Sequence, residues 1–282
     1  MQPETKNNPN ILFHYTSIGT LLDILSKQNE DNKICFRATH AKFLNDPSEY
    51  QLAVSLLKQS MINYENENSI KNGNSTYFND ELIKKLTLVS GNPFILSFSA
   101  NADDLSMWRS YGADGKGVAI GLDRKMLEAY ANNDNTINTR LLQCIYNKQK
   151  IINKLTTEWG NLYNEITFMD EGKKIGLSSF DFFFDIIKQS FSFKEEDYCV
   201  ENEWRLCTNV TDNKTLRYRN NGDLIVPYIE HYFNKEIIKK ITVGPCVNKE
   251  LSKESIEMFV KSKEYQLSSD SIIASKISYR QI

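Results

Sequence analysis

The 282-residue sequence predicts a single α+β domain with one helical insertion. Short apolar runs bounded by turn residues, such as residues 94–96 and 118–122, are typical of buried strands. Segments with apolar residues at helical spacing, such as residues 18–25, separate these runs. Because neither an internal repeat nor a linker divides the chain, residues 11–282 are expected to form one domain after a disordered lead-in of residues 1–10.

The N-terminal third is expected to alternate strands and helices. Residues 11–16 read as a short strand, and Ser17 caps a helix that reaches Leu25. Side chains in residues 33–39 alternate in polarity, which predicts a second strand. In this strand Arg37 and Phe36 point to opposite faces. There follow a turn at 45–47, a helix from Asp46 or Ser48 to about residue 64, a loop over 65–77 and a helix over 80–89.

The stretch from residue 94 to residue 122 holds the densest group of side chains suited to specific contacts. Between its two predicted strands lie Trp108, Tyr111 and several acids and glycines. Glycine allows close backbone approach, and aromatic rings supply flat faces for stacking, so this connection is a candidate ligand-binding segment. The alternative is that Trp108 and Tyr111 share one helical turn and fill the core.

The C-terminal half is expected to continue in the same α+β manner. An aromatic-rich helical insertion over 148–194 contains a phenylalanine cluster near residue 182, which is either a satellite core or an apolar face for a partner. The other predicted elements are helices over 123–131 and 249–261 and strands over 141–146, 203–209, 224–228, 237–243 and 272–279.

Composition narrows the class of protein. The formal net charge of −2 gives no global electrostatic argument for nucleic acid or membrane. The N-terminus has no signal-peptide pattern, and no apolar run is long enough to cross a bilayer. Five scattered cysteines without CxxC spacing are expected to be free thiols in a reducing compartment. We therefore expect a cytoplasmic protein without membrane contact.

Several kinds of site lack their sequence motifs. The three histidines are dispersed, and no acidic cluster has EF-hand spacing, so no metal site is expected. The sequence has no Walker P-loop, no GxGxxG after the first predicted strand and no GxSxG elbow. Classical nucleotide-phosphate and serine-hydrolase sites are therefore not predicted.

Three groups of residues carry candidate chemistry. His14, Tyr15 and Thr16 end the first predicted strand, where a histidine can fix a ribose hydroxyl or a phosphate. The alternative is a histidine bonded to backbone at a strand–helix corner. Ser97 and Ser99 share one strand face and can hold a ligand or, alternatively, a neighbouring strand.

The third group is Glu201, Glu203 and Arg205, which share one face if this segment is a strand, with Trp204 on the other. Two carboxylates about 7 Å apart can hold a sugar hydroxyl and stabilise a developing positive charge. Closely spaced acids also separate their pKa values, which leaves one as a general base. Arg205 is expected to hold Glu203 in place. The alternative is a solvated edge strand with alternating charges.

Five motifs occur in an order that resembles the bacterial family DUF2971. They are HYTS at 14–17, LNDPSE at 44–49, SFSANADDLSMWRSYG at 97–112, GVAIGL at 117–122 and ENEWR at 201–205. This resemblance covers about residues 11–245. It implies no activity by itself.

The same residues also resemble elements of the ADP-ribosyltransferase superfamily, which implies a split mixed β-sheet and NAD as co-substrate. His14-x-Thr16 resembles the His-x-Thr of one branch, which implies that His14 holds the adenosine ribose. Ser97-x-Ser99 and Glu201-x-Glu203 resemble elements of another branch, which implies that Glu203 is the catalytic glutamate and that Glu201 assists the acceptor. The NAD-binding residues implied are His14, Tyr15, Thr16, Arg37, Asn45, Ser97, Ser99, Trp108 and Tyr111.

The resemblance thus implies a metal-independent ADP-ribosyltransferase that modifies RNA, DNA or a protein. A toxin or antiphage effector with an antitoxin partner is the expected biological role. Two alternatives remain open: an NAD glycohydrolase with the same pocket, and a non-enzymatic nucleotide-sensing module. A metal-dependent nuclease is a more distant alternative.

Overall fold

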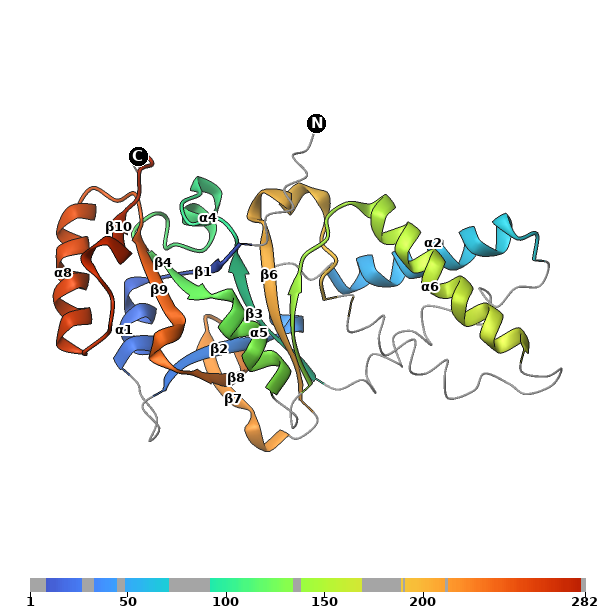
Figure 1. Ribbon diagram of the computed structural model, residues 1–282, viewed down its shortest axis with the longest axis horizontal. Helices are drawn as coiled ribbons and strands as arrows, with labels where there is room; N and C mark the ends of the chain where they lie inside the picture. Colours follow the sequence, from blue (N-terminus) through green and yellow to red (C-terminus); the bar gives the residue numbers. More distant parts are fainter. Residues whose placement is uncertain are drawn as a thin grey trace.

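The structure is a computed structural model that describes residues 9–26, 33–44, 49–70, 92–133, 138–168, 189, 191–210 and 213–279. In this part of the chain ten strands form one mixed sheet flanked by helices, which confirms the α+β class (Figure 1). The strands are β1 (Ile11–Thr16), β2 (Ile34–His40), β3 (Asn92–Ser99), β4 (Val118–Asp123), β5 (Asn138–Gln143), β6 (Glu203–Val210), β7 (Arg217–Asn221), β8 (Leu224–Phe233), β9 (Ile238–Val243) and β10 (Ile272–Ala274). The helices are α1 (Ile18–Ser26), α2 (Glu49–Glu67), α4 (Leu105–Ser110), α5 (Arg124–Asn133), α6 (Lys148–Phe168) and α8 (Lys249–Ser262).

Most predicted elements that fall in the described residues are confirmed, and several differ. Strand β5 covers Asn138–Gln143 and not 141–146, and β8 continues to Phe233 and does not end at residue 228. Strand β7 was not predicted, because all five of its residues are exposed and show no apolar alternation. Strand β10 ends at Ala274 and not at residue 279, because the chain then leaves the sheet and the Ser275 hydroxyl donates to Asp103 at 2.6 Å. The predicted turn at 45–47, the helix at 80–89 and the phenylalanine cluster at 180–184 lie outside the described residues.

The two faces of the sheet have different characters. Phe36, Phe98 and Trp204 project from β2, β3 and β6 into a hydrophobic core that also receives side chains from α1, α5 and α8. Strand alternation turns Ser97 and Glu203, which adjoin these residues in the sequence, toward the opposite face. The side-chain directions predicted for these strands are therefore confirmed, and the polar groups share one face.

The sheet splits at β3, which has three neighbouring strands. Strand β6 pairs with one edge of β3 along its whole length, from Asn92↔Val210 to Ser99↔Glu203. On the other edge β1 pairs only at Phe13↔Ser99, while β2 pairs at Thr39↔Ile95 and His40↔Phe94. The strands β1 and β2 thus diverge from opposite ends of one edge. Two wings continue from them in the orders β1–β4–β9–β10 and β2–β8–β7.

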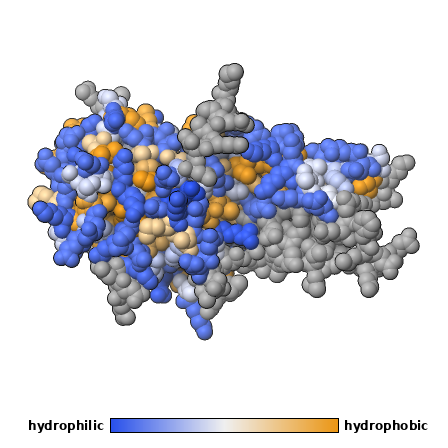
Figure 2. Space-filling model, viewed as in Figure 1, coloured by the Kyte–Doolittle hydropathy of each residue, from blue (hydrophilic) through white to orange (hydrophobic). Residues whose placement is uncertain are grey.

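Helices α2 and α6 lie side by side and extend away from the sheet as an arm (Figure 1). The Ser60 hydroxyl of α2 donates to the Ile152 carbonyl of α6 at 3.3 Å. Gly160 permits close packing here, since a Cβ at this position would lie 2.5 Å from the Tyr64 ring. Helix α6 confirms the first part of the predicted insertion. On the surface shown in Figure 2, hydrophilic residues predominate and apolar residues form separate patches.

Candidate functional site

Two adjoining cavities occupy the split between β1 and β2. The first, of about 240 Å³, is lined by His14, Ser97 and Tyr111 together with a group of charged side chains. The second, of about 430 Å³, lies between the C-terminal half of β1, the N-terminal half of β2 and α1. Both are lined by His14, Ser97 and Arg219, so they form one continuous region of a size suited to a small-molecule ligand.

His14 lies in the split itself. Its Nδ1 is 3.0 Å from the Ser97 carbonyl oxygen, which only accepts, so Nδ1 carries the proton and Nε2 of the neutral ring is an acceptor. Burial lowers the pKa of His14, and the bond to Ser97 offsets this only in part. The ring is therefore neutral at neutral pH. His14 thus makes the hydrogen bond to backbone that one interpretation predicts. It also lines the cavity, as the other interpretation requires.

Ser97 and Ser99 share the polar face, as predicted, but they differ in surroundings. Ser97 lines both cavities. Ser99 is fully buried, donates to the Glu201 carbonyl at 2.6 Å and accepts from the Asn101 amide at 3.0 Å. Ser99 therefore stabilises the turn that carries Glu201, and Ser97 is the member of the pair that faces the cavities.

Glu201 reaches the site from a short helix and not from a strand, which corrects the sequence prediction. The 3₁₀ segment η3 (Glu196–Glu201) ends at Asn202, whose φ of 45° and ψ of 48° are left-handed. Asparagine adopts this conformation more readily than most residues. Strand β6 begins one residue later, at Glu203. The left-handed turn breaks strand alternation between the two acids, yet their carboxylates converge.

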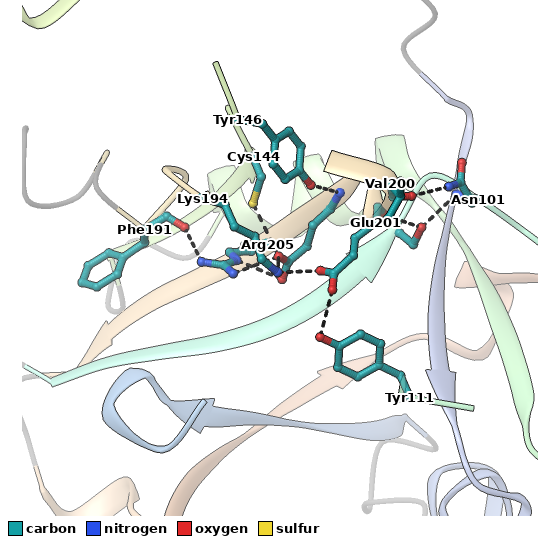
Figure 3. Close-up of polar contacts among 11 residues, drawn as sticks. Asn101, Tyr111, Cys144, Tyr146, Phe191, Lys194, Val200, Glu201 and Arg205 are labelled. Carbon is teal, nitrogen blue, oxygen red and sulfur yellow. Dashed lines mark hydrogen bonds and ion pairs between the residues drawn. The ribbon is translucent and has the colours of Figure 1, made fainter. Parts of the chain in front are cut away.

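Glu203 and Arg205 form a buried two-point ion pair (Figure 3). Arg205 Nε donates to Glu203 Oε1 at 2.9 Å, and Nη2 donates to Oε2 at 2.8 Å. The remaining Nη1 donates to the Phe191 carbonyl at 3.0 Å. Burial alone would raise the pKa of Glu203, but Arg205 and Lys194 outweigh burial and lower it to about 2. The predicted pairing of Arg205 with Glu203 is confirmed.

Lys194 joins the two carboxylates. Its ammonium group donates to Glu201 Oε2 at 2.5 Å (Figure 3) and to Glu203 Oε2 at 2.8 Å. The ammonium group also lies 4.8 Å from the centre of the Tyr198 ring. The residue is only 4% exposed. Burial would lower the pKa of Lys194, but the two carboxylates together raise it above its ordinary value. The cluster thus contains two anions and two cations in a nearly closed space.

Tyr111 connects this cluster to α4. Its hydroxyl donates to Glu201 Oε1 at 3.1 Å. Asp104 caps the helix by accepting from the amides of Ser106 and Met107 at 2.9 and 3.2 Å, which positions the turn that ends at Tyr111. Burial and the neighbouring Glu201 raise the pKa of Tyr111 to about 12, so this phenol remains a hydrogen-bond donor.

Two residues after β5 support Glu203 from behind. The Cys144 amide donates to the Glu203 carbonyl at 2.9 Å, and the Glu203 amide donates to the Tyr146 hydroxyl oxygen at 2.7 Å. The Cys144 thiol lies 3.7 Å from Glu203 Oε2. Burial raises the pKa of this thiol well above its usual range, so Cys144 is a packing residue and not a thiolate nucleophile.

Each carboxylate keeps one oxygen with a single partner among the described contacts. Glu203 Oε1 accepts only from Arg205 Nε, and Glu201 Oε1 accepts only from Tyr111. A carboxylate oxygen has two lone pairs. Since both acids line the first cavity, these oxygens are positioned to accept a hydrogen bond from a ligand hydroxyl.

The second cavity has a cationic wall. Arg37 and Arg219 line it, Arg219 Nη2 donates to the Thr39 hydroxyl at 3.0 Å, and the Arg37 guanidinium lies 5.1 Å from the centre of the Tyr228 ring. Burial and the proximity of Arg37 lower the pKa of Arg219. Two neighbouring guanidinium groups favour an anionic ligand.

The structure brings most of the predicted site residues together. Tyr15 lines both cavities and Thr16 lines the second. Trp108 does not line either cavity: it is fully buried, its Nε1 donates to Asp103 at 2.7 Å, and its ring packs edge-on against Tyr15. Trp108 therefore fills the core, as the alternative interpretation of this segment predicts. Asn45 lies outside the described residues.

Two functional candidates were not found from the sequence. Lys194 is one lysine in a charged segment, and only the return of the chain beside Ile145, through a parallel bridge at Phe193, brings it to the acids. Arg219 belongs to the unpredicted strand β7. Neither residue carries a local signal that distinguishes it from a solvated cation.

The described residues lack both a metal-binding cluster and a membrane-spanning helix. They contain no group of three or more histidine, cysteine, aspartate or glutamate side chains that could hold a metal ion. Among the helices described here, none is long and apolar enough to span a membrane.

Comparison with known proteins gives one partial match. No curated protein and no solved structure matches the chain. The match expected over residues 11–245 is found over a shorter range. It includes residues 107–110 of α4, all of β4 and the start of β6, but neither β1 nor β2. Residues 107–206 match the model of DUF2971, a family described as protein of unknown function.

Proposed function

We propose that the protein is an NAD-dependent ADP-ribosyltransferase that binds NAD in the split between β1 and β2. The observation that carries this proposal is the convergence of His14, Glu201 and Glu203 on one cavity, from segments at distant points of the chain. The divergence of β1 and β2 from one edge of β3 opens that cavity. This arrangement supports the split sheet that the sequence resemblance implies.

The carboxylates suit the chemistry of glycosidic cleavage. As the bond from the ribose to nicotinamide breaks, positive charge develops on the ribose. A carboxylate beside the ribose stabilises that charge, and Glu203 is ionised, fixed by Arg205 and open at Oε1. Nicotinamide leaves as a neutral molecule with the electron pair of that bond, and an acceptor hydroxyl or amine then bonds to the ribose carbon and gives its proton to Glu201. Glu201, with its open Oε1, is assigned to the acceptor side.

The cationic wall suits the other half of the ligand. NAD carries a diphosphate between its two nucleosides, and guanidinium groups bind phosphate oxygens through paired hydrogen bonds. Arg37 and Arg219 line the second cavity, which continues from the first past His14. A dinucleotide that spans the two cavities would place its diphosphate near these arginines and one ribose near Glu203.

A nicotinamide-release assay tests the proposal. Purified full-length protein is incubated with NAD labelled in the adenylate, with and without total cellular RNA, DNA and protein. The variant Glu203→Gln removes the charge that the reaction needs, and Glu254→Gln, an exposed glutamate on α8, is the matched control. We expect release by the wild type and the control and a loss of at least about a hundredfold in Glu203→Gln.

The fate of the label separates the alternatives. Label in one macromolecule fraction supports transfer and identifies the acceptor class, whereas free ADP-ribose alone identifies an NAD glycohydrolase. NAD binding without release in any of the proteins would indicate a nucleotide-sensing module. If NAD neither binds nor is cleaved, the proposal is wrong.

We further propose that the activity makes the protein a toxin or antiphage effector that a partner protein restrains. Induced expression should then stop growth for the wild type and Glu254→Gln but not for Glu203→Gln, at equal protein levels. Equal growth arrest by all three proteins would contradict an NAD-dependent toxin.

A further inference from the structure

A row of arginines leads out of the cavity along the second wing of the sheet. Arg217 and Arg219 alternate with Tyr218 on β7, so both lie on one face of that strand. This face is the cavity face, because Arg219 reaches Thr39 and lines both cavities. Arg37 of β2 lies on the same face, over Tyr228, whose register partner on β7 is Arg217. The three guanidinium groups therefore run from the cavity to the edge of the sheet.

The excess of positive charge lies on β7, because the second cavity is lined by two arginines and two acids. None of the three arginines forms an ion pair with a carboxylate in the described part of the chain. The acids that line the second cavity are Asp23 and Glu230. The Tyr232 hydroxyl donates to Glu230 at 2.8 Å. From residue 213 to residue 222 the sequence has three cations and no acid, although the whole chain has a net charge of −2. The positive charge is therefore local.

Strand β7 is also an edge strand of the sheet. It ends the strand order, and all five of its residues are exposed (Figure 1). Tyr218 is 62% exposed on the face opposite the arginines. A chain that passes over this edge thus meets cationic groups on one face and an aromatic ring on the other, which is the combination that binds single-stranded nucleic acid.

We propose that the exposed edge strand β7 binds the backbone of a single-stranded nucleic acid and leads one nucleotide to the mouth of the first cavity, beside the NAD that Arg37 and Arg219 hold. This inference rests on the proposed function for the acceptor role, although the binding itself does not require NAD. Because one ribose of NAD occupies the first cavity of about 240 Å³, the opening beside it does not admit a base pair, so the acceptor unit must be unpaired. Arg217, about 7 Å along the strand from Arg219, contacts a phosphate of this backbone outside the cavities.

Fluorescence anisotropy of the full chain without NAD tests this surface. The probes are a labelled single-stranded RNA, the DNA of the same sequence, the corresponding duplex and a glutamate-rich peptide. Arg217→Glu changes a cation that has no described contact, Arg217→Lys restores the charge, and Lys239→Glu on β9 of the other wing is the matched control. Nicotinamide release is measured on the same preparations.

We expect Arg217→Glu to weaken single-strand binding by roughly tenfold and to reduce the salt dependence of log K by about one unit. Lys239→Glu should bind as the wild type does, and Arg217→Lys should recover most of the affinity. Preference for RNA or for DNA then names the acceptor. Equal weakening by Lys239→Glu, stronger binding to the duplex or to the peptide, or no binding would overturn the inference. Arg217-dependent binding without nicotinamide release would instead refute only the proposed function.

Discussion

The site depends on a buried group of two carboxylates and two cations. Lys194 is the only one of these residues that contacts both acids in the described structure, through bonds of 2.5 and 2.8 Å. In the described part of the chain, Arg205 contacts Glu203 but not Glu201. Glu201 therefore depends on Lys194 for its counter-charge, and Lys194 acts as a positioning residue for both carboxylates.

Replacement of Lys194 by methionine should therefore destabilise the fold. The buried carboxylates would lose a shared cation, and breaking a buried ion pair typically costs about 3–5 kcal/mol. Urea unfolding measures the free energy difference. Lys148→Met is the control, because its ion pair with Glu195 at 2.7 Å is exposed and should change stability little. Similar losses in both variants would show that Lys194 has no special role.

Lowering the pH should reduce the free energy of unfolding, because the Glu203 carboxylate becomes protonated. The pKa of this carboxyl is about 2 in the folded protein and near 4.5 in the unfolded chain, so its stabilising effect is complete above pH 4.5 and is lost as the pH falls from 4.5 to about 2. The difference of about 2.5 units corresponds to roughly 3 kcal/mol.

This effect is measured as the urea-unfolding free energy of the wild type and of Glu203→Gln across that pH range. The difference between the two proteins should shrink by roughly 3 kcal/mol toward low pH, while Glu254→Gln should follow the wild type. A difference that stays constant with pH would mean that Glu203 is not ionised in the fold.

At the scale of elements, the junction of η3 and β6 brings Glu201 to Glu203. Its left-handed residue, Asn202, has a φ of 45°. Asn202→Gly should preserve stability, because glycine adopts this conformation freely. Asn202→Val should cost about 1–3 kcal/mol and lower nicotinamide release, because a β-branched residue is strained there. Circular dichroism on heating and the release assay provide the two readouts. Equal stability of both variants would show that this turn is not constrained.

The elements also show how much of the site was predictable. The faces of β3 and β6 followed from the sequence because strand alternation is local, so Ser97, Glu203 and Arg205 were placed correctly. The position of Lys194 was not predictable, because it depends on the pairing of Phe193 with Ile145, a contact between distant segments. Strand β7 was missed because an exposed edge strand lacks the apolar alternation that marks buried ones.

At the scale of the molecule, the two wings of the sheet separate where β1 and β2 leave β3. Neither the sequence periodicity nor any single motif indicates that one strand edge serves both β1 and β2. That topology places His14 of one wing and Arg37 of the other around connected cavities. A ligand in the split therefore touches both wings, and its binding should stabilise them together.

NAD should accordingly raise the stability of the whole domain and slow amide hydrogen exchange in the strands that border the split. At a concentration of about one hundred times Kd, binding to the folded state adds about 2.7 kcal/mol to the free energy of unfolding. Amide hydrogen exchange should slow in both the C-terminal half of β1 and the N-terminal half of β2, because the ligand lies between them. Arg37→Ala should reduce the thermal shift and the protection in both wings, whereas Lys239→Ala on β9 should leave them unchanged. Protection confined to one wing, or a shift that survives Arg37→Ala, would place NAD elsewhere and remove the structural basis for the proposed reaction.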